Sequence, residues 1–189
     1  MISASEFRKG TKFLYQDAPH IVIDFQHVKP GKGGAFVRTK MRNMISGSIY
    51  EETFRSEEKF PSPDLEYKNM QYLYHSEGEG YCFMDQEDFD QVSLTKEQLE
   101  DVLDYLKEQE IYDILYFEGK PIAVTAPLFM NLKVTETQPG VRGDTAKGGA
   151  TKPATMETGL VLSVPLFVEE GDVLKVDTRD KRYIERVKE

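Results

Sequence analysis

Lys32 has the most distinctive setting of any reactive side chain in the sequence, because three glycines and one proline lie within two residues of it. The stretch is Lys29-Pro30-Gly31-Lys32-Gly33-Gly34-Ala35-Phe36. Glycine has no side-chain bulk and adopts positive φ at little cost, so a lysine flanked in this way can enter a space too narrow for an ordinary loop. The amine could serve as a nucleophile or as a positively charged arm. The simpler alternative is a solvated turn, since glycine and proline are common turn residues.

The surroundings of Lys32 argue against covalent chemistry. A nucleophilic lysine needs burial or a neighbouring cation to favour its neutral amine, whereas a glycine-rich turn is open to water. The stretch is also not a phosphate-binding P-loop, because the G-x-x-x-x-G-K-[ST] spacing is missing and a strand follows it. We find no catalytic triad and no carboxylate pair at a recognisable spacing, so we expect no catalytic residue and no enzyme.

The remaining reactive side chains predict neither a metal nor a cofactor. The sequence has one cysteine, Cys82, which we expect to pack as a small hydrophobic side chain. The three histidines, His20, His27 and His75, lack the close spacing of a metal site.

The elements around Lys32 predict a β-hairpin with Lys32 near its tip. Residues 21–28 and 36–42 are rich in β-branched and aromatic side chains, which is typical of strands. Arg38, Lys40 and Arg42 alternate with Val37, Thr39 and Met41, so we expect the three charges on one face of the sheet. Together with Lys29, this face suits an RNA backbone, although a solvated sheet surface is the common alternative.

Proline-rich links near residues 60–64 and 125–127 predict three domains: 1–63, 64–127 and 128–189. Short strands at close intervals favour an SH3-like barrel in the first. Strands interrupted by a helix favour an OB-type barrel in the second domain. Thr95 and Gln98 have the spacing of a capping box, which marks the start of this helix, and Glu100, Asp101, Asp104 and Glu108 are expected on its water-facing side. The third is expected to be all-β, with a surface loop over residues 138–158.

The formal net charge of −9 is unevenly distributed over these three domains. They carry +3, −12 and 0 respectively. This distribution allows the end domains to contact RNA while the acidic middle domain is held away from it. The chain shows no apolar signal core and no run long enough to span a bilayer, so we expect a cytoplasmic protein with no membrane contact.

Three separate motifs resemble bacterial translation elongation factor P. They are Lys29-Pro30-Gly31-Lys32-Gly33-Gly34-Ala35-Phe36 with Arg38, the Val141-Arg142-Gly143-Asp144-Thr145 loop, and a C-terminal series of Lys152-Pro153-Ala154-Thr155-Met156-Glu157-Thr158-Gly159, Val164-Pro165-Leu166-Phe167-Val168 and Val176-Asp177-Thr178-Arg179, ending in Tyr183 and Arg186. The resemblance covers the whole chain. The C-terminal series is much more specific than the glycine-rich stretch.

The resemblance implies an all-β protein with an SH3-like (KOW-like) domain and two OB-type barrels in an L-shaped, tRNA-like arrangement. It implies a factor that binds both ribosomal subunits between the peptidyl and exit sites, stimulates peptide-bond formation and relieves stalling on consecutive prolines. Lys32 would reach the peptidyl-transferase centre beside the CCA end of the peptidyl-tRNA. A separate lysine-modifying enzyme would act on Lys32.

The same resemblance implies roles for residues at the other end of the chain. Arg142, Gly143, Asp144 and Thr145 would face the small subunit and the exit-site mRNA codon. Tyr183 and Arg186 would contact tRNA. We expect a monomer. Two alternatives remain open: a divergent paralogue with another stall specificity, and a stand-alone RNA-binding OB protein.

Overall fold

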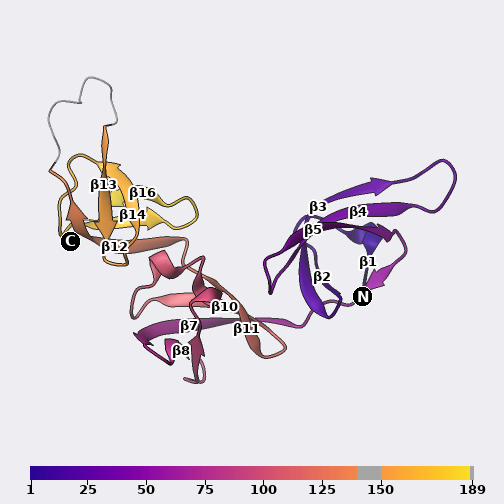
Figure 1. Ribbon diagram of the computed structural model, residues 1–189, viewed down its shortest axis with the longest axis horizontal. Helices are drawn as coiled ribbons and strands as arrows, with labels where there is room; N and C mark the ends of the chain where they lie inside the picture. Colours follow the sequence, from indigo (N-terminus) through magenta and orange to yellow (C-terminus); the bar gives the residue numbers. More distant parts are fainter. Residues whose placement is uncertain (140–149, 188–189) are drawn as a thin grey trace. The chain divides into compact units, whose positions relative to one another are not determined.

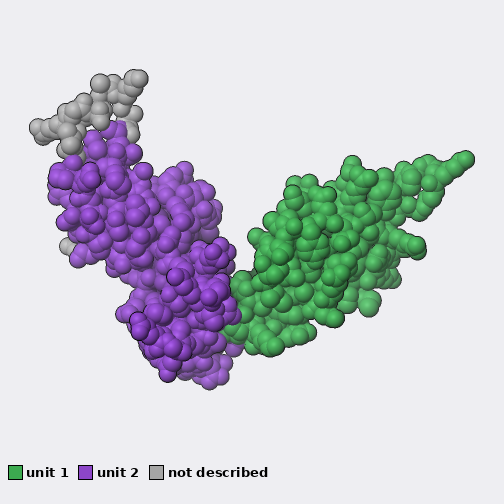
Figure 2. Space-filling view, viewed as in Figure 1, with its two compact units in different colours: residues 1–67, 115–123 green, residues 68–114, 124–189 purple. Residues whose placement is uncertain are grey.

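The computed structural model describes residues 1–139 and 150–187, which form strands connected by turns and three short 3-10 helices (Figure 1). Two compact units can be distinguished (Figure 2). Unit 1 consists of residues 1–67 and 115–123, and unit 2 of residues 68–114 and 124–189. The protein is all-β, as the sequence predicts.

The first sheet contains the strands that position Lys32. Its antiparallel order is β2 (Lys12–Tyr15), β3 (Ala18–Val28), β4 (Phe36–Asn43) and β5 (Ile49–Arg55). A second pair, β1 (Ile2–Ser3) and β6 (Lys59–Phe60), and the 3-10 helix η1 (Ala4–Glu6) cover it. The core is largely aromatic and consists of Ala4, Phe7, Phe13, Val22, Val37, Met41, Phe54 and Phe60. The SH3-like barrel and the predicted hairpin are both confirmed.

The turn between β2 and β3 lies earlier than the sequence suggests. The proline at position 19 suggests a turn there, but Ala18 and Pro19 pair with Tyr15 and Leu14 as the first residues of β3. Gln16 and Asp17 form the turn with φ values of 51° and 58°. Two consecutive positive φ values match the right-handed twist of a two-residue hairpin, which explains the short connection.

The middle sheet follows the predicted strand pattern. Its order is β11 (Lys120–Thr125), β10 (Ile111–Phe117), β7 (Leu65–Ser76), β8 (Gly80–Asp85) and β9 (Gln91–Leu94). Cys82 is buried in β8, as predicted. The predicted helix after residue 94 is only two 3-10 turns, η2 (Glu97–Leu99) and η3 (Leu103–Tyr105). Its capping box does form, because the Thr95 N–H donates to Gln98 Oε1 at 2.9 Å and the Gln98 N–H to Thr95 Oγ1 at 3.4 Å.

The last sheet has the antiparallel order β14 (Val161–Pro165), β13 (Thr151–Met156), β12 (Phe129–Thr137), β15 (Val173–Asp177) and β16 (Arg182–Arg186). Strand β13 corrects our prediction of a loop over residues 138–158. The strand was hidden because its buried positions are Lys152, Ala154 and Met156 rather than large β-branched residues. Pro153 lies next to the last residue that pairs with β12, so its missing N–H costs no bond to that strand.

Candidate functional site

The tip of the β3–β4 hairpin is the best candidate for a functional site. The two strands pair from His20 opposite Asn43 to Val28 opposite Phe36. Figure 1 shows the hairpin extending past the other strands of unit 1, and in Figure 2 it is a narrow projection from that unit. The paired strands therefore hold the glycine-rich loop away from the barrel.

Lys32 is fully available to a partner. Lys29 and Lys32 are both exposed. Within the described residues, the Lys32 ammonium group forms no hydrogen bond or ion pair. Its charge is thus neither neutralised nor held in one orientation by the protein itself.

The backbone of this loop requires glycine at only one of its three glycine positions. Gly33 has φ +114°, a conformation that side chains disfavour. Gly31 and Gly34 do not have positive φ values, and a Cβ atom added to either would meet no atom within 4 Å. The fold alone therefore does not explain Gly31 and Gly34, which is consistent with a loop that must fit a narrow external space.

The predicted charged face on β4 is confirmed, but the neighbours of its three cations differ. Arg38, Lys40 and Arg42 are exposed, while the residues between them are buried. Lys40 lies opposite Asp24 on β3 and Glu51 on β5. Arg38 lies between Gln26 on β3 and Thr53 on β5, and Arg42 lies between Ile21 and Ile49. Neither arginine therefore has a charged residue directly opposite it.

Asp24 belongs to a small network of charges at this face. Its carboxylate is 3.3 Å from Lys9 Nζ. The hydrogen bond from Lys9, assisted by the backbone N–H of Phe25 and by Lys40, lowers the pKa of Asp24. Asp24 is therefore ionised at neutral pH and partly neutralises Lys40, so Arg38 and Arg42 are the stronger attractors of an anion.

The opposite face of the hairpin carries a cationic cluster that we did not predict. The Arg8 guanidinium lies 5.6 Å from the centre of the Phe25 ring, and Arg8 Nη1 is 3.4 Å from His27 Nε2. The alternation in Phe25-Gln26-His27 could have placed both rings on one face. No local pattern could have brought in Arg8, which is 19 residues before His27 in the sequence.

Of the residues predicted at the other end of the chain, Tyr183 and Arg186 belong to unit 2, whereas Lys32 belongs to unit 1. Arg142, Gly143, Asp144 and Thr145 fall outside the described residues. Tyr183 is half-buried in β16 opposite Val176. Arg186 is exposed, with its guanidinium 5.5 Å from the Phe167 ring centre and Nη1 3.4 Å from Asp172 Oδ2.

The Val176-Asp177-Thr178-Arg179 motif has a clear structural role. Arg179 donates to both carboxylate oxygens of Asp177, at 3.0 and 2.6 Å. This contact, with the backbone N–H of Arg179, lowers the pKa of the buried Asp177 to about 2. The Thr178 hydroxyl donates to the Pro127 carbonyl oxygen at 2.8 Å, which fixes the segment that leads into β12.

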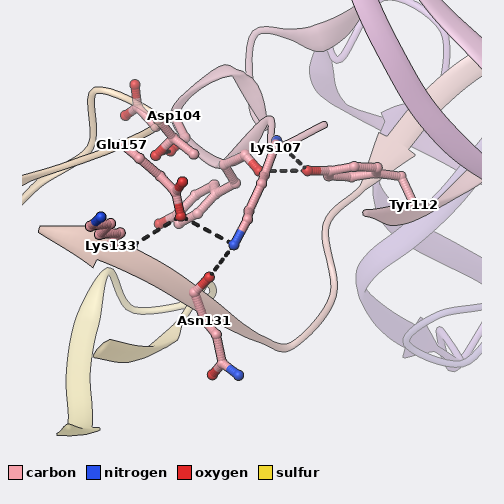
Figure 3. Close-up of polar contacts among 8 residues, drawn as sticks. Asp104, Lys107, Tyr112, Asn131, Lys133 and Glu157 are labelled. Atoms are coloured by element: carbon pink, nitrogen blue, oxygen red, sulfur yellow. Dashed lines mark hydrogen bonds and ion pairs between the residues drawn. The ribbon is translucent and has the colours of Figure 1, made fainter. Parts of the chain in front are cut away.

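A second polar network joins the η3 region to the last sheet within unit 2 (Figure 3). Lys107 Nζ donates to the Asn131 carbonyl oxygen at 2.8 Å and lies 3.1 Å from Glu157 Oε1. The same Glu157 oxygen accepts the Lys133 N–H at 2.9 Å. One lysine thus connects β12 and the turn after β13 to the segment that follows η3.

Asp104 is exposed, as predicted, and it also takes part in the same junction. The Thr158 hydroxyl donates to the Asp104 carbonyl oxygen at 2.6 Å. Lys181 Nζ lies 3.0 Å from the Asp104 carboxylate. A pattern of exposed carboxylates cannot distinguish solvent from a neighbouring sheet, because the partners are more than fifty residues away in sequence.

The described residues contain no cluster of three or more His, Cys, Asp or Glu side chains able to hold a metal ion. No helix among them is long and apolar enough to cross a membrane.

Three family models match consecutive parts of the chain. Residues 3–60 match the elongation factor P KOW-like domain, residues 65–124 the elongation factor P OB domain, and residues 130–186 the elongation factor P C-terminal domain.

Curated relatives match over the full length. Elongation factor P of Alkaliphilus oremlandii is 54% identical over 187 residues, covering 99% of this chain and 100% of the relative. The Clostridioides difficile protein of the same name is 52% identical over the same shares. That of Thermodesulfovibrio yellowstonii is 49% identical over 189 residues and covers both chains completely.

A solved structure shares the fold at low identity. Eukaryotic translation initiation factor 5A from Methanococcus jannaschii superposes with a TM-score of 0.56 at 18% identity. The match covers 66% of this chain and 93% of that chain.

Proposed function

The chain belongs to the elongation factor P family of translation factors, and we propose that it binds the ribosome between the peptidyl and exit sites to stimulate peptide-bond formation on consecutive prolines. The observation that supports this most is the hairpin tip. An exposed lysine without a protein partner stands on a projecting hairpin, beside two glycines that the local backbone does not require. Such a tip is suited to entering a narrow site on another molecule.

The proposed mechanism is positional. Lys32 would place a positive charge beside the CCA end of the peptidyl-tRNA in the peptidyl-transferase centre. Holding the tRNA end in a productive geometry lowers the entropic part of the barrier, and no acid or base is needed from the factor. The ribosome remains the catalyst.

Lys32 is also the proposed target of a lysine-modifying enzyme. The exposed tip gives such an enzyme access from several directions, and the flanking Pro30, Gly31, Gly33 and Gly34 add little bulk. A longer side chain at this position would extend the reach of the arm.

We propose further RNA contacts for residues other than Lys32. Lys29, Arg38, Lys40 and Arg42 would approach RNA near the hairpin, and Tyr183 and Arg186 would contact tRNA. Arg142, Gly143, Asp144 and Thr145 would face the exit-site codon. We propose three modules, 1–63, 64–127 and 128–189, whose bounds are supported by the three family-model ranges.

The proposal is tested by the rate at which purified ribosomes form a peptide with consecutive prolines. Wild-type protein should raise this rate, and Lys32→Ala should reduce the stimulation on the order of tenfold or more, because the positioning group is lost. Lys59→Ala removes one exposed lysine from β6 and serves as the matched control. Equal rates with wild-type protein and Lys32→Ala, or no stimulation by wild-type protein, would overturn the proposal.

A further inference from the structure

The cluster of Arg8, Phe25 and His27 lies on the hairpin face opposite Arg38. Phe25 is directly opposite Thr39 and His27 opposite Val37, whereas Gln26 is opposite Arg38. Side chains alternate between the two faces of a sheet, so Phe25 and His27 share the face that Arg38 does not occupy. Arg8 reaches this face from the segment that follows η1.

The protein already holds the Arg8 guanidinium in place. Nη1 donates to the Phe7 carbonyl oxygen at 2.7 Å, and the Arg8 backbone N–H donates to Thr11 Oγ1 at 3.0 Å. The guanidinium also lies against the Phe25 ring. Arg8 forms no ion pair within the described part of the chain and is exposed. An arginine has five N–H donors, so several remain for a ligand that binds without reordering the side chain.

The contact between Arg8 and His27 constrains where the imidazole proton can be. Arg8 Nη1 only donates, so at 3.4 Å the His27 Nε2 atom faces it as an acceptor when the ring is neutral. A protonated ring would place two cations side by side. That state becomes favourable when an anion accepts hydrogen bonds from both groups.

No carboxylate among the described residues takes the place of such an anion. Val37 is the residue of β4 opposite His27, and Arg8 is the charged group facing it from the η1 side. The acids nearest in sequence are Glu6 and Asp24. The Glu6 carboxylate accepts from the backbone N–H and the hydroxyl of Ser3, and Asp24 lies on the other face and contacts Lys9. Lys29 adds another exposed cation two residues further along the chain.

We propose that Arg8 and His27 form a phosphate-binding site for the RNA backbone, in which binding is coupled to protonation of His27. The inference rests on the proposed function, because it concerns the same hairpin when its tip is inside the ribosome. A phosphate oxygen would accept from the Arg8 guanidinium and another from the protonated imidazole. The hairpin would then contact RNA on both faces, with Arg38 and Arg42 on the other.

The coupling gives a direction for the pH dependence. An imidazole ordinarily changes charge between pH 5 and 8. Because the bound phosphate favours the charged ring, binding takes up a proton, and affinity rises as the pH falls. One linked proton gives at most about a tenfold change in the dissociation constant per pH unit.

The test compares wild type, Arg8→Gln, His27→Gln and the control Lys59→Gln. The dissociation constant for ribosomes carrying initiator tRNA is measured at pH 6.0 and 7.5 at constant salt. Wild type and Lys59→Gln should bind several-fold more tightly at pH 6.0, and His27→Gln should lose this difference. Arg8→Gln should weaken binding about fivefold or more at pH 6.0 and reduce the salt dependence by about one counterion. Thermal unfolding midpoints verify that each variant is folded.

The inference is overturned if His27→Gln keeps the wild-type pH ratio, or if Arg8→Gln binds within twofold of Lys59→Gln. Failure of wild type to bind ribosomes at all would overturn the proposed function instead. In that case the phosphate site is tested without ribosomes. The His27 ring is titrated by NMR in the full chain, with and without a twelve-residue oligouridine. A titration midpoint that RNA moves to higher pH in wild type, and not in Arg8→Gln, supports the site, and an unmoved midpoint refutes it.

Discussion

Lys32 and its neighbouring glycines show how single residues can be excluded from a structural role. The positive φ of Gly33 requires glycine at that position. Gly31 and Gly34 have ordinary backbone conformations, and a Cβ added to either would meet no atom within 4 Å. Lys32 has no partner among the described residues. These residues leave room for another molecule to approach the hairpin tip, and the proposed role of Lys32 requires such access.

Replacement of Gly31 or Gly34 by alanine separates folding from function. We expect each variant to keep its stability within about 0.5 kcal/mol, because the added Cβ meets no atom and no positive φ is strained. The stimulation of consecutive-proline synthesis should fall, because side-chain bulk is added beside Lys32. Urea unfolding and the peptide-synthesis rate are measured on the same preparations. Stable variants with wild-type stimulation would show that the glycines do not serve access.

The contact between Asp177 and Arg179 predicts a pH-dependent stability. The folded pKa of Asp177 is lowered to about 2, below the ordinary value of about 3.9 for an unfolded chain. The ionised carboxylate therefore stabilises the fold above about pH 4, and this contribution is lost as the pH falls towards 2. Arg179→Gln should reduce stability most at pH 6, with the difference disappearing near pH 2. Urea midpoints across this range check it, and a deficit independent of pH would contradict it.

Among the elements, those with regular patterns were predictable and those set by distant contacts were not. The alternation in β4 gave the strand, its bounds to one residue and its charged face. Strand β13 escaped prediction because Lys152 occupies a buried position, where its ammonium group donates to the Gln138 carbonyl oxygen at 2.7 Å. The helix after residue 94 was overestimated because apolar spacing alone does not show that the two 3-10 turns are separate.

In the candidate site too, local sequence patterns predict some residues, and contacts between distant segments determine the others. Lys32 and the β4 cations follow from composition and alternation, whereas Arg8 joins the hairpin only through the folded chain. The opposition of Asp24 and Glu51 to Lys40 likewise depends on the strand register, which the sequence does not specify.

The junction around Lys107 predicts a stabilising contact between elements. Lys107→Met keeps the apolar stem but removes the bonds to the Asn131 carbonyl oxygen and to the Glu157 carboxylate. The Glu157 side chain is only 33% exposed, so water screens this ion pair incompletely. We expect unit 2 to lose about 1–2 kcal/mol in urea unfolding. The control Lys175→Met breaks a more exposed pair with Glu185, at 3.6 Å, and should cost less than about 0.5 kcal/mol. Equal losses would show that the junction contributes nothing beyond a surface ion pair.

For the whole molecule, the uneven charge complements the proposed contacts. Residues 64–127 carry −12, while the segments on either side carry +3 and 0. RNA should repel the middle segment and tolerate the others. Among the exposed cations that we assign to RNA, Arg38 and Arg42 near one end of the chain and Arg186 near the other lie outside the acidic segment.

The most direct test of the central claim is to locate residue 32 on the ribosome. Lys32→Cys can be labelled selectively with an iron chelate that generates hydroxyl radicals, because the natural cysteine, Cys82, is buried. The bound protein should cleave RNA around the peptidyl-transferase centre and at the CCA end of the peptidyl-tRNA, and a chelate at Lys59→Cys should give a different pattern. Cleavage confined to other regions, or one pattern from both positions, would contradict the claim that the hairpin carries Lys32 into that centre.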